Sequence, residues 1–385
     1  MNKPIPYGRQ SITKEDLLAV EESLMSDYLT QGPKIEEFEV AFSKYIGSKY
    51  AVAVSNGTTA LHLCALALDV NTDSNVITSP ITFAATANCI RYCDGNVYFA
   101  DINSENFTLD VEKVEELILS KPKGFFKGII PVDFAGYPVN LEAFKQIADK
   151  YNLWLIQDSC HSPGGYFYDI NNNKQNCGNG NFSELSIFSF HPVKHIACGE
   201  GGMITTNNKK LYEKLILLRT HGITKNPSLL NENHGGWYYE MQDLGYNYRL
   251  TDFQAALGLS QLNRASDGIE RRKLIAKKYN EKFENKFYIK RQSGFVLGHA
   301  YHLYIICVER RKELFNYLKE KNINCQVHYI PLHLHPYYKK FGWVVGDFPI
   351  SEKYYEECLS LPMYPTLSDE EQDYVIQAIE DFFEN

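Results

Sequence analysis

Residues 51–78 read AVAVSNGTTALHLCALALDVNTDSNVIT, and this stretch decides the class of the fold. It opens with a short apolar run at 51–54, continues in a helical pattern from 58 to 68, and closes on a second β-rich run at 75–78. A strand, a helix and another strand in this order are typical of a βαβ unit, in which the two strands are parallel. The stretch therefore predicts an α/β protein.

The alternation of strands and helices continues along the chain. Further strands are expected at 97–100, 126–132, 153–156, 185–189 and 202–206, with helices at 84–92, 141–151 and 209–220. Short connections between such elements place parallel strands side by side and helices over them. We expect a mostly parallel sheet with helices on both faces.

Two helices are expected before the first strand. One runs from Thr13 to about residue 26 and begins with a threonine cap, and its three leucines should be buried: Leu17, Leu18 and Leu24. The other runs from about residue 35 to 45 and stops at Gly47, a residue type that commonly ends helices.

The second half of the chain departs from this alternation. Residues 226–248 form a predicted loop rich in Asn, Gly and Tyr, long enough to be functional or to reach a partner subunit. From residue 251 a helical pattern continues towards 283, where it is expected to link to a smaller domain. We assign residues 1–260 to a large domain and residues 261–385 to a small C-terminal domain.

The composition excludes several classes of protein. The 385 residues include 39 Lys and Arg against 47 Asp and Glu, a net charge of -8, which argues against a nucleic-acid binder. The hydrophobic fraction of 44% argues against a disordered chain. No signal-peptide core opens the sequence, and no apolar run approaches the roughly 20 residues that span a bilayer, so we expect a cytoplasmic protein without membrane contact.

Cysteine and histidine usage does not predict a metal centre. The nine cysteines are scattered without a CxxC pair, and we interpret them as mostly buried free thiols. The histidine-rich stretch 328–336 lacks the partner spacing of a zinc site. We expect it to form a loop with structural or substrate contacts.

Ligands of such sheets bind at the carboxyl ends of the strands, so polar residues there are candidates for a site. Residues 55–59, SNGTT, follow the first strand and open a helix whose free amides suit a phosphate, although Ser and Asn are also ordinary caps. Asp158 directly follows another strand. It is either a turn residue or a buried carboxylate that holds a positive ring nitrogen.

Lys194, in the stretch FSFHPVKH at 188–195, has apolar and aromatic neighbours. A cation in such surroundings is costly unless it is paired or deprotonated. Lys194 is either a surface lysine whose stem lies along apolar neighbours, or a Schiff-base lysine, whose amine must be near-neutral to attack a carbonyl. The segment 245–252, GYNYRLTD, is likewise either a helix cap or a part of the site.

In chain order these motifs form a specific constellation. It consists of 55–59, Asp158 with His161, Ser189 five residues before Lys194, GEGG at 199–202, and 245–252. Over about residues 5–365 it resembles the sugar aminotransferases of the DegT/DnrJ/EryC1/StrS family. The resemblance implies a fold-type I enzyme that depends on pyridoxal 5'-phosphate, with a mostly parallel seven-stranded sheet between helices in the large domain and a smaller α+β C-terminal domain.

The resemblance also assigns roles in the chemistry. Lys194 would bind the cofactor covalently and then act as the general base and acid of the proton shift. Asp158 would pair with the pyridine nitrogen and keep it protonated, and His161 would lie beside the ring. Phe83 matches the ring-stacking aromatic residue of the family; the alternative is a core Phe at the start of a helix.

Phosphate and substrate contacts follow from the same resemblance. The phosphate would be bound by the backbone around Gly57 and Thr58, by the Ser189 hydroxyl, and by Asn247 of a second subunit, which implies a homodimer with shared active sites. Four residues match segments that border the sugar-nucleotide site in such enzymes: Tyr7, Arg219, His328 and His333.

The motifs at 5–10, 189–195 and 327–333 look most like the pseudaminic-acid branch of the family, which aminates C4 of a UDP-linked 2-acetamido-4-keto-6-deoxy sugar. L-Glutamate is the expected donor. The alternatives are an aminotransferase for a dTDP-linked 3-keto sugar or GDP-4-keto-6-deoxymannose, and a non-catalytic ligand-binding α/β protein. A sugar 3-dehydratase is disfavoured because that branch typically has His in place of Lys194. Gln157 departs from the acid that relatives often carry there, which would change the surroundings of Asp158.

Overall fold

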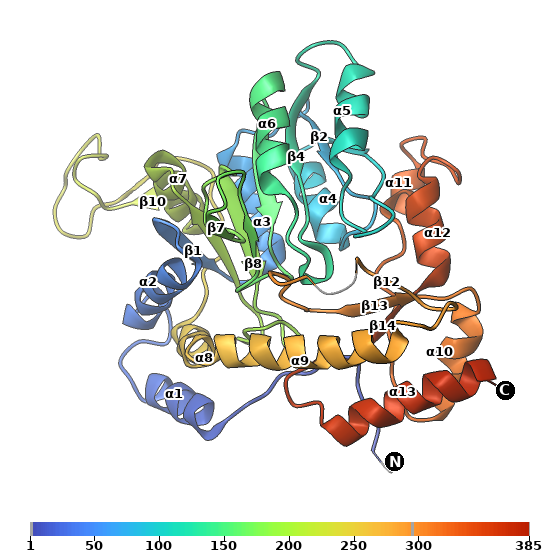
Figure 1. The fold of residues 1–385 in the computed structure, drawn as a ribbon. Helices are drawn as coiled ribbons and strands as arrows, with labels where there is room; N and C mark the ends of the chain where they lie inside the picture. Colours follow the sequence, from blue (N-terminus) through green and yellow to red (C-terminus); the bar gives the residue numbers. More distant parts are fainter. Residues whose placement is uncertain (1–2, 294–295, 385) are drawn as a thin grey trace.

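The computed structural model describes residues 3–293 and 296–384, and a seven-stranded sheet lies at its centre (Figure 1). The strand order is β1-β9-β8-β5-β4-β2-β3. The strands are β1 (Tyr50–Val54), β2 (Asn75–Thr78), β3 (Asn96–Phe99), β4 (Phe126–Ile130), β5 (Trp154–Asp158), β8 (Leu185–Ser189) and β9 (Gly202–Thr206). Only β9 is antiparallel to its neighbours, β1 and β8. The prediction of a mostly parallel seven-stranded sheet is therefore confirmed.

Helices cover both faces of the sheet, because strand side chains alternate between two apolar layers. Val52, Val54 and Ile156 belong to the layer that faces α3 (Gly57–Ala67), α4 (Ala84–Tyr92) and α7 (Lys209–Arg219). Ala53 and Leu155 belong to the opposite layers, under α2 (Pro33–Ile46), α5 (Val111–Leu119), α6 (Leu141–Tyr151) and α8 (Asp252–Leu262). Burial on both faces explains why the strands read as nearly continuous apolar runs.

Helix α1 (Lys14–Leu24) begins at Thr13 as expected, with a capping box between Thr13 and Asp16. The prediction that its leucines are buried is wrong: Leu17, Leu18 and Leu24 are each more than half exposed. The face that packs against α8 carries the fully buried Asp16, which accepts hydrogen bonds from Ser260 and Gln261. The apolar face of α1 is therefore left towards solvent in the single chain.

The helix expected from residue 251 towards 283 is two helices, α8 and α9 (Ala265–Phe283). The break lies at Arg264, whose backbone is not helical and whose guanidinium turns back to Asp16 and the Ser11 carbonyl. The ion pair between Arg264 and Asp16 fixes the angle between α8 and α9, so that α9 runs across the C-terminal part of the molecule (Figure 1).

The predicted loop 226–248 lies in an arm that extends away from the body, at the left of Figure 1. Its two short strands, β10 (Ile223–Thr224) and β11 (Glu240–Met241), pair antiparallel. The Glu240 carboxylate accepts hydrogen bonds from the backbone amides of Asn231 and Glu232 and from the Tyr238 hydroxyl. Five apolar side chains of the arm are exposed: Leu229, Trp237, Tyr239, Met241 and Leu244.

The C-terminal part is an α+β unit with its own apolar core. Its antiparallel sheet has the order β12 (Lys290–Arg291), β13 (Tyr304–Cys307) and β14 (Cys358–Leu361). Its helices after α9 are α10 (Arg311–Glu320), α11 (Pro336–Lys339), α12 (Pro349–Glu357) and α13 (Asp369–Glu384). Ile5 packs into the same core and pairs with Ile323, so the first described residues lie against the C-terminal part.

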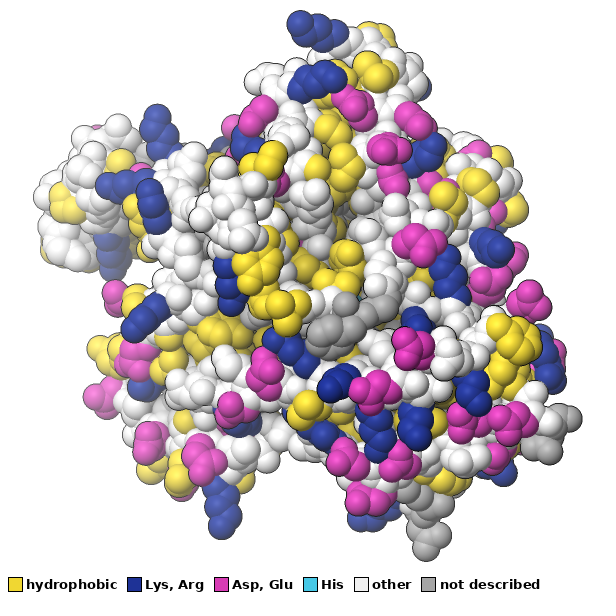
Figure 2. Space-filling view, viewed as in Figure 1, with side chains coloured by type: hydrophobic (Ala, Val, Ile, Leu, Met, Phe, Trp, Pro, Cys, Tyr) yellow, Lys and Arg dark blue, Asp and Glu magenta, His cyan; other side chains and the backbone are white. Residues whose placement is uncertain are grey.

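Surface and thiol properties agree with a globular protein. All nine cysteines are free, and six of them are buried, as the sequence predicted. Acidic and basic side chains are interspersed over the face shown in Figure 2. Within 3–293 and 296–384, we find no helix with both the length and the apolar character needed to cross a membrane.

Candidate active site

A cavity of about 560 Å³ lies at the carboxyl ends of the parallel strands. The strand ends contribute Gly57 after β1, Phe83 after β2 and Val132 after β4, while β5 and β8 end in the lining residues Asp158 and Ser189. The segment 326–329 of the C-terminal part closes the other side. The site is therefore built by both parts of the chain.

Asp158 is a buried carboxylate, 4% exposed, at the end of β5. One oxygen accepts a hydrogen bond from the Thr86 hydroxyl at 2.8 Å, and the other accepts from the Cys160 amide at 3.2 Å. It forms no ion pair with any other described residue. A buried negative charge without a cation is costly, so this carboxylate suits a positively charged group that binds in the cavity.

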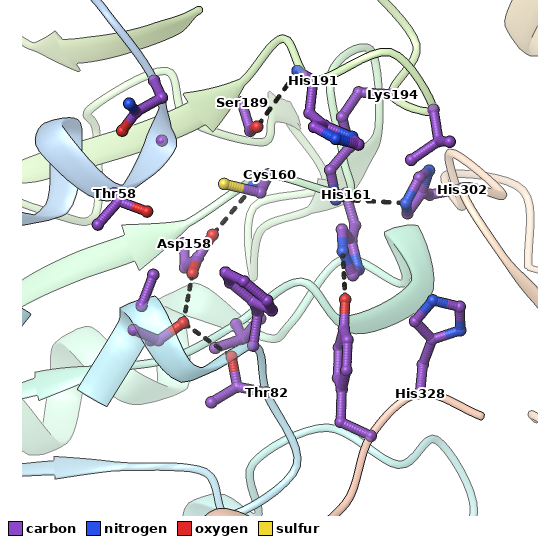
Figure 3. A pocket seen from close by; sticks show the side chains of 18 of the residues that line it. Thr58, Thr82, Asp158, Cys160, His161, Ser189, His191, Lys194, His302 and His328 are labelled. Carbon is purple, nitrogen blue, oxygen red and sulfur yellow. Dashed lines mark hydrogen bonds between the residues drawn. The ribbon is translucent and has the colours of Figure 1, made fainter. Parts of the chain in front are cut away.

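Lys194 follows β8 and its amino group lies in the same cavity (Figure 3). Burial lowers the pKa of Lys194 to about 8; the charges of Cys160 and Asp158 oppose this shift, and the charge of Arg272 adds a smaller lowering effect that is included in it. A substantial fraction of the amine is therefore neutral near pH 8, as a nucleophilic lysine requires. The Nζ atom lies 3.3 Å from Nε2 of His302.

His161 lies between Lys194 and the C-terminal part of the cavity (Figure 3). Its Nδ1 accepts a hydrogen bond from the Ala135 amide at 3.1 Å, so its ring proton is on Nε2, which lies 3.4 Å from the Tyr329 hydroxyl. Burial, and then the charge of Lys194, holds the pKa of His161 well below its usual value. The ring is a neutral hydrogen-bond donor towards Tyr329.

The first turn of α3 forms a cradle with Ser189. Helix α3 begins at Gly57, behind the cap Asn56, and the amides of Gly57 and Thr58 have no carbonyl partner within the helix. A Cβ atom on Gly57 would lie 3.1 Å from Cβ of Ser189 and 3.5 Å from Sγ of Cys160. Glycine thus keeps open a small space lined by amides and a hydroxyl, which fits the phosphate of a cofactor.

Three more of the predicted residues reach this cavity. Phe83 is 60% exposed at the start of α4, with its ring 6.2 Å from that of Tyr329, and is not a core residue. Tyr7 and His328 line the opposite side, with their ring centroids 5.5 Å apart. Nδ1 of His328 bonds to the Ser360 hydroxyl at 2.9 Å. Their contacts with a substrate stay predictions.

The other three predicted residues do not line the cavity of the single chain. Arg219 bonds to Glu39 and to the Ala53 carbonyl, which ties α7 to α2 and β1. His333 is fully buried and pairs with Glu352 at 2.8 Å. Asn247 is exposed, beside the arm. Arg219 and His333 have structural partners here, whereas Asn247 is exposed, and its contact with the phosphate of a second subunit stays a prediction.

Gln157 takes part in a buried network beneath Asp158. The Asp133 carboxylate accepts hydrogen bonds from Gln157 Nε2 at 2.9 Å, from the Ser159 hydroxyl at 2.9 Å and from the Ser162 hydroxyl at 2.5 Å. Because an amide donates where a second carboxylate would repel, Gln157 allows Asp133 to ionise. The network fixes the segment that carries Asp158 and His161.

Asp133 makes stability depend on pH. Burial raises its pKa from 3.8 to about 6, and the hydrogen bonds from Ser162 and Val139 limit the rise. Because the folded-state pKa exceeds the unfolded value, the stabilisation by the neutral acid is complete below about pH 4 and is lost by about pH 7, a difference of about 3 kcal/mol. We expect the unfolding free energy of the wild type, relative to Asp133→Asn, to fall by this amount in urea titrations over that range. A constant difference would contradict the raised pKa.

Sequence reasoning missed several residues of the site. Tyr329 lies within the histidine-rich stretch, and Thr86, in the first turn of α4, lies four residues after Thr82, so local spacing could have indicated both. His302 has no such signal, because it precedes the apolar strand β13 in an ordinary pattern. Only the tertiary structure brings His302 to Lys194.

Comparisons with known proteins agree with this geometry. The model of the DegT/DnrJ/EryC1/StrS aminotransferase family matches residues 10–380. The chain is 39% identical to an uncharacterized protein of Methanocaldococcus jannaschii, covering 97% of this chain and 96% of the relative. It is 35% identical to the UDP-4-amino-4,6-dideoxy-N-acetyl-beta-L-altrosamine transaminase of Campylobacter jejuni, with 94% and 93% covered.

Among solved structures, PseC of Helicobacter pylori, an aminotransferase involved in the biosynthesis of pseudoaminic acid, superposes with a TM-score of 0.89. It is 30% identical, and the match covers 99% of this chain and all of that one. Because the match covers nearly the whole length of both chains, it supports both the same fold and the same class of chemistry. The chain belongs to the DegT/DnrJ/EryC1/StrS aminotransferase family and is a sugar aminotransferase that depends on pyridoxal 5'-phosphate.

Proposed function

We propose that the enzyme transfers an amino group from L-glutamate to C4 of a UDP-linked 2-acetamido-2,6-dideoxy-4-keto-hexose, the step that forms UDP-4-amino-4,6-dideoxy-N-acetyl-β-L-altrosamine. The observation that carries the chemistry is that Lys194 and Asp158 face one cavity, which extends to residues 326–329. The sugar assignment is supported by relatives named for this transaminase, which are 34–35% identical. The volume of the cavity lies within the range of small-molecule sites.

The residues present fit the cofactor. Bound pyridoxal phosphate would supply an aldehyde that carries the amino group and a ring that accepts electrons. Lys194 would hold it covalently and move a proton at Nζ, and Asp158 would hold the proton of the ring nitrogen. Ser189 and the amides of Gly57 and Thr58 would bind the phosphate. His161 and Phe83 would contact the ring.

The substrate assignment is tested in two stages with the purified, cofactor-loaded protein. L-Glutamate alone is expected to bleach the yellow colour of the lysine-bound cofactor and to release one equivalent of 2-oxoglutarate per site. The UDP-linked 4-keto sugar should then restore the colour and yield an aminated sugar nucleotide by mass spectrometry. The matched controls are a dTDP-linked 3-keto sugar and GDP-4-keto-6-deoxymannose.

Each outcome decides between the alternatives. Faster restoration by either control sugar would replace the UDP-sugar assignment with that substrate. A colour that ignores L-glutamate would contradict the proposed donor. A protein that binds the cofactor phosphate but never turns yellow would contradict the covalent role of Lys194 and favour the ligand-binding alternative.

We also propose that the enzyme is a homodimer with shared active sites. The cavity residues of the described chain include Lys194 but no second lysine and no arginine, although a cofactor phosphate and an acidic donor are to be bound. The exposed apolar side chains of the arm and of α1 are the kind of surface that another subunit covers. Asn247 lies beside this arm, is exposed and does not line the cavity of its own chain.

Subunit mixing tests the shared site. Lys194→Ala and Asn247→Asp are each expected to be nearly inactive as homodimers, the second because a carboxylate repels the phosphate. In an equal mixture half of the dimers are mixed, and each mixed dimer has one intact site, so about a quarter of the wild-type activity should return. The control is a mixture of Lys194→Ala with Asp158→Asn, which restores nothing because each site takes both residues from the same subunit. A mixture that stays inactive would contradict the contribution of Asn247 across the interface.

A further inference from the structure

Three histidine rings, those of His302, His161 and His195, lie close together next to Lys194, and they differ in what fixes their protons. The ring of His302 lies with its centroid 4.3 Å from that of His161 and 5.6 Å from that of His195. Of the three, only His302 makes a hydrogen-bonding contact with the amine, with its Nε2 3.3 Å from Nζ of Lys194 (Figure 3). Among the described residues, His302 is thus the direct partner of the lysine.

The other two rings are each held in one tautomer. Nδ1 of His161 accepts from the Ala135 amide, so Nε2 carries the proton. Nε2 of His195 lies 2.9 Å from the Ala300 carbonyl oxygen, so that nitrogen must donate and Nδ1 is bare. A backbone group fixes the tautomer in both cases.

His302 lacks such a constraint. Its Nδ1 is buried and has no hydrogen-bond partner among the described residues. A neutral imidazole can carry its proton on either nitrogen, and the bond made by one nitrogen selects the site of the proton. The state of Lys194 therefore selects the tautomer of His302.

Burial and the surrounding charges keep His302 from becoming an imidazolium. Arg272 is fully buried, and its Nη1 donates to the carbonyls of Tyr301, His302 and Met363 at 3.1, 3.2 and 2.9 Å. No carboxylate of the described chain pairs with this guanidinium. Burial, then the charge of Lys194 and, with smaller effects, His161, His195 and Arg272, hold the pKa of His302 well below its usual value. Asp158 and Cys160 face Lys194 and favour its charged form.

The backbone fixes where His302 stands. Gly136 has a φ of 93°, and a Cβ there would lie 2.7 Å from the His161 carbonyl oxygen and 3.0 Å from the His302 amide nitrogen. The carbonyls of Ala135 and Gly136 accept from the amides of Leu303 and Ala300. This close approach, together with the Arg272 clamp, sets the ring against the lysine.

We propose that His302 is a positioning residue that holds the amino group of Lys194 in both of its protonation states by changing tautomer. To the ammonium, Nε2 is an acceptor and the ring proton is on Nδ1. To the neutral amine, Nε2–H is a donor and Nδ1 is bare. In the change between them the Lys194–His302 pair loses one proton to solvent, and the remaining ring proton is on Nε2 instead of Nδ1, so the ring is neutral in both states. The inference rests on the proposed role of Lys194, which must be both base and acid.

The direct test is nitrogen NMR of the full-length, cofactor-free protein with ¹⁵N-labelled histidine, from pH 6 to pH 10. As Lys194 titrates near pH 8, the proton of His302 is expected to move from Nδ1 to Nε2 without an imidazolium stage. The signals of His161 and His195 serve as internal controls and should keep their tautomers. In Lys194→Met the tautomer change should disappear. A single tautomer across the range, a protonated ring, or a change that survives Lys194→Met would overturn the proposal.

Two variants add a readout in the loaded enzyme. His302→Leu removes both the donor and the acceptor, whereas His302→Gln has an amide that presents either NH₂ or oxygen by rotation. We expect His302→Leu to slow the L-glutamate half-reaction about tenfold, the effect of losing one buried hydrogen bond, and His302→Gln to restore most of the rate. Equal losses in both variants would indicate a packing role. An active Lys194→Ala variant would contradict the proposed function. The NMR experiment tests the tautomer change of His302 independently of that result.

Discussion

Lys194→Ala is expected to lower the rate of transamination at least about 10,000-fold while the protein keeps its fold. The amine is the group that has both a lowered pKa, of about 8, and a place in the cavity beside Asp158. Its loss removes the covalent attachment of the cofactor and the proton carrier together. The measurement is single-turnover conversion of L-glutamate, with circular dichroism to verify the fold.

Two further variants make this result specific. Lys194→Arg keeps a cation but has no amine that can attack an aldehyde, so it should be as inactive as the alanine variant. Lys113→Ala removes an exposed lysine that pairs with Glu116 and should leave the rate unchanged. Normal turnover by Lys194→Ala would exclude Lys194 as the catalytic lysine.

Asp158→Asn is expected to lower turnover about 100- to 1,000-fold with the cofactor still bound, because the amide preserves the shape of the site but removes its negative charge. The hydrogen bonds from Thr86 and from the Cys160 amide can be made to the amide oxygen only in part. Without the carboxylate the ring nitrogen loses the partner that keeps it protonated. Stopped-flow absorbance after mixing with L-glutamate measures this step.

The matched control is Asp101→Asn, at another buried carboxylate. Asp101 accepts hydrogen bonds from the amides of Ile350 and Ser351, and it does not line the cavity. We expect Asp101→Asn to lower stability but to leave the glutamate half-reaction intact. Similar rate losses in the two variants would show that the effect at Asp158 is a general result of losing a buried charge.

The part of the fold that the sequence predicted is the part determined by local patterns. Helices 84–92 and 141–151 begin and end at the expected residues because apolar periodicity, and for the second helix the Asn140 cap, act within a few residues. The sheet follows from the alternation of strands and helices. The helical stretch predicted from residue 251 towards 283 is interrupted at Arg264, which local patterns did not indicate, since the ion pair between Arg264 and Asp16 joins residues far apart in the chain.

The site was predictable where residues stand at strand ends and follow a known motif order. Lys194, Asp158, Ser189 and Gly57 were found in this way, and the structure brings them to one cavity. Leu17 shows the opposite case, because periodicity reveals an apolar face but not what covers it. His302 and Asp133 depend on contacts between distant segments, which a single sequence does not contain.

The buried free cysteines allow local opening of the native protein to be measured through the reactivity of their thiols. Burial raises the pKa of Cys64 and Cys89, between the sheet and the α3–α4 layer, and of Cys307, in the C-terminal part, so little reactive thiolate exists while these regions stay closed. The rate at which each thiol is alkylated is therefore limited by how often its own region opens. Cys64 and Cys89 lie in the large part and Cys307 in the C-terminal part. The alkylation rates of these thiols therefore measure how often each of the two parts opens locally.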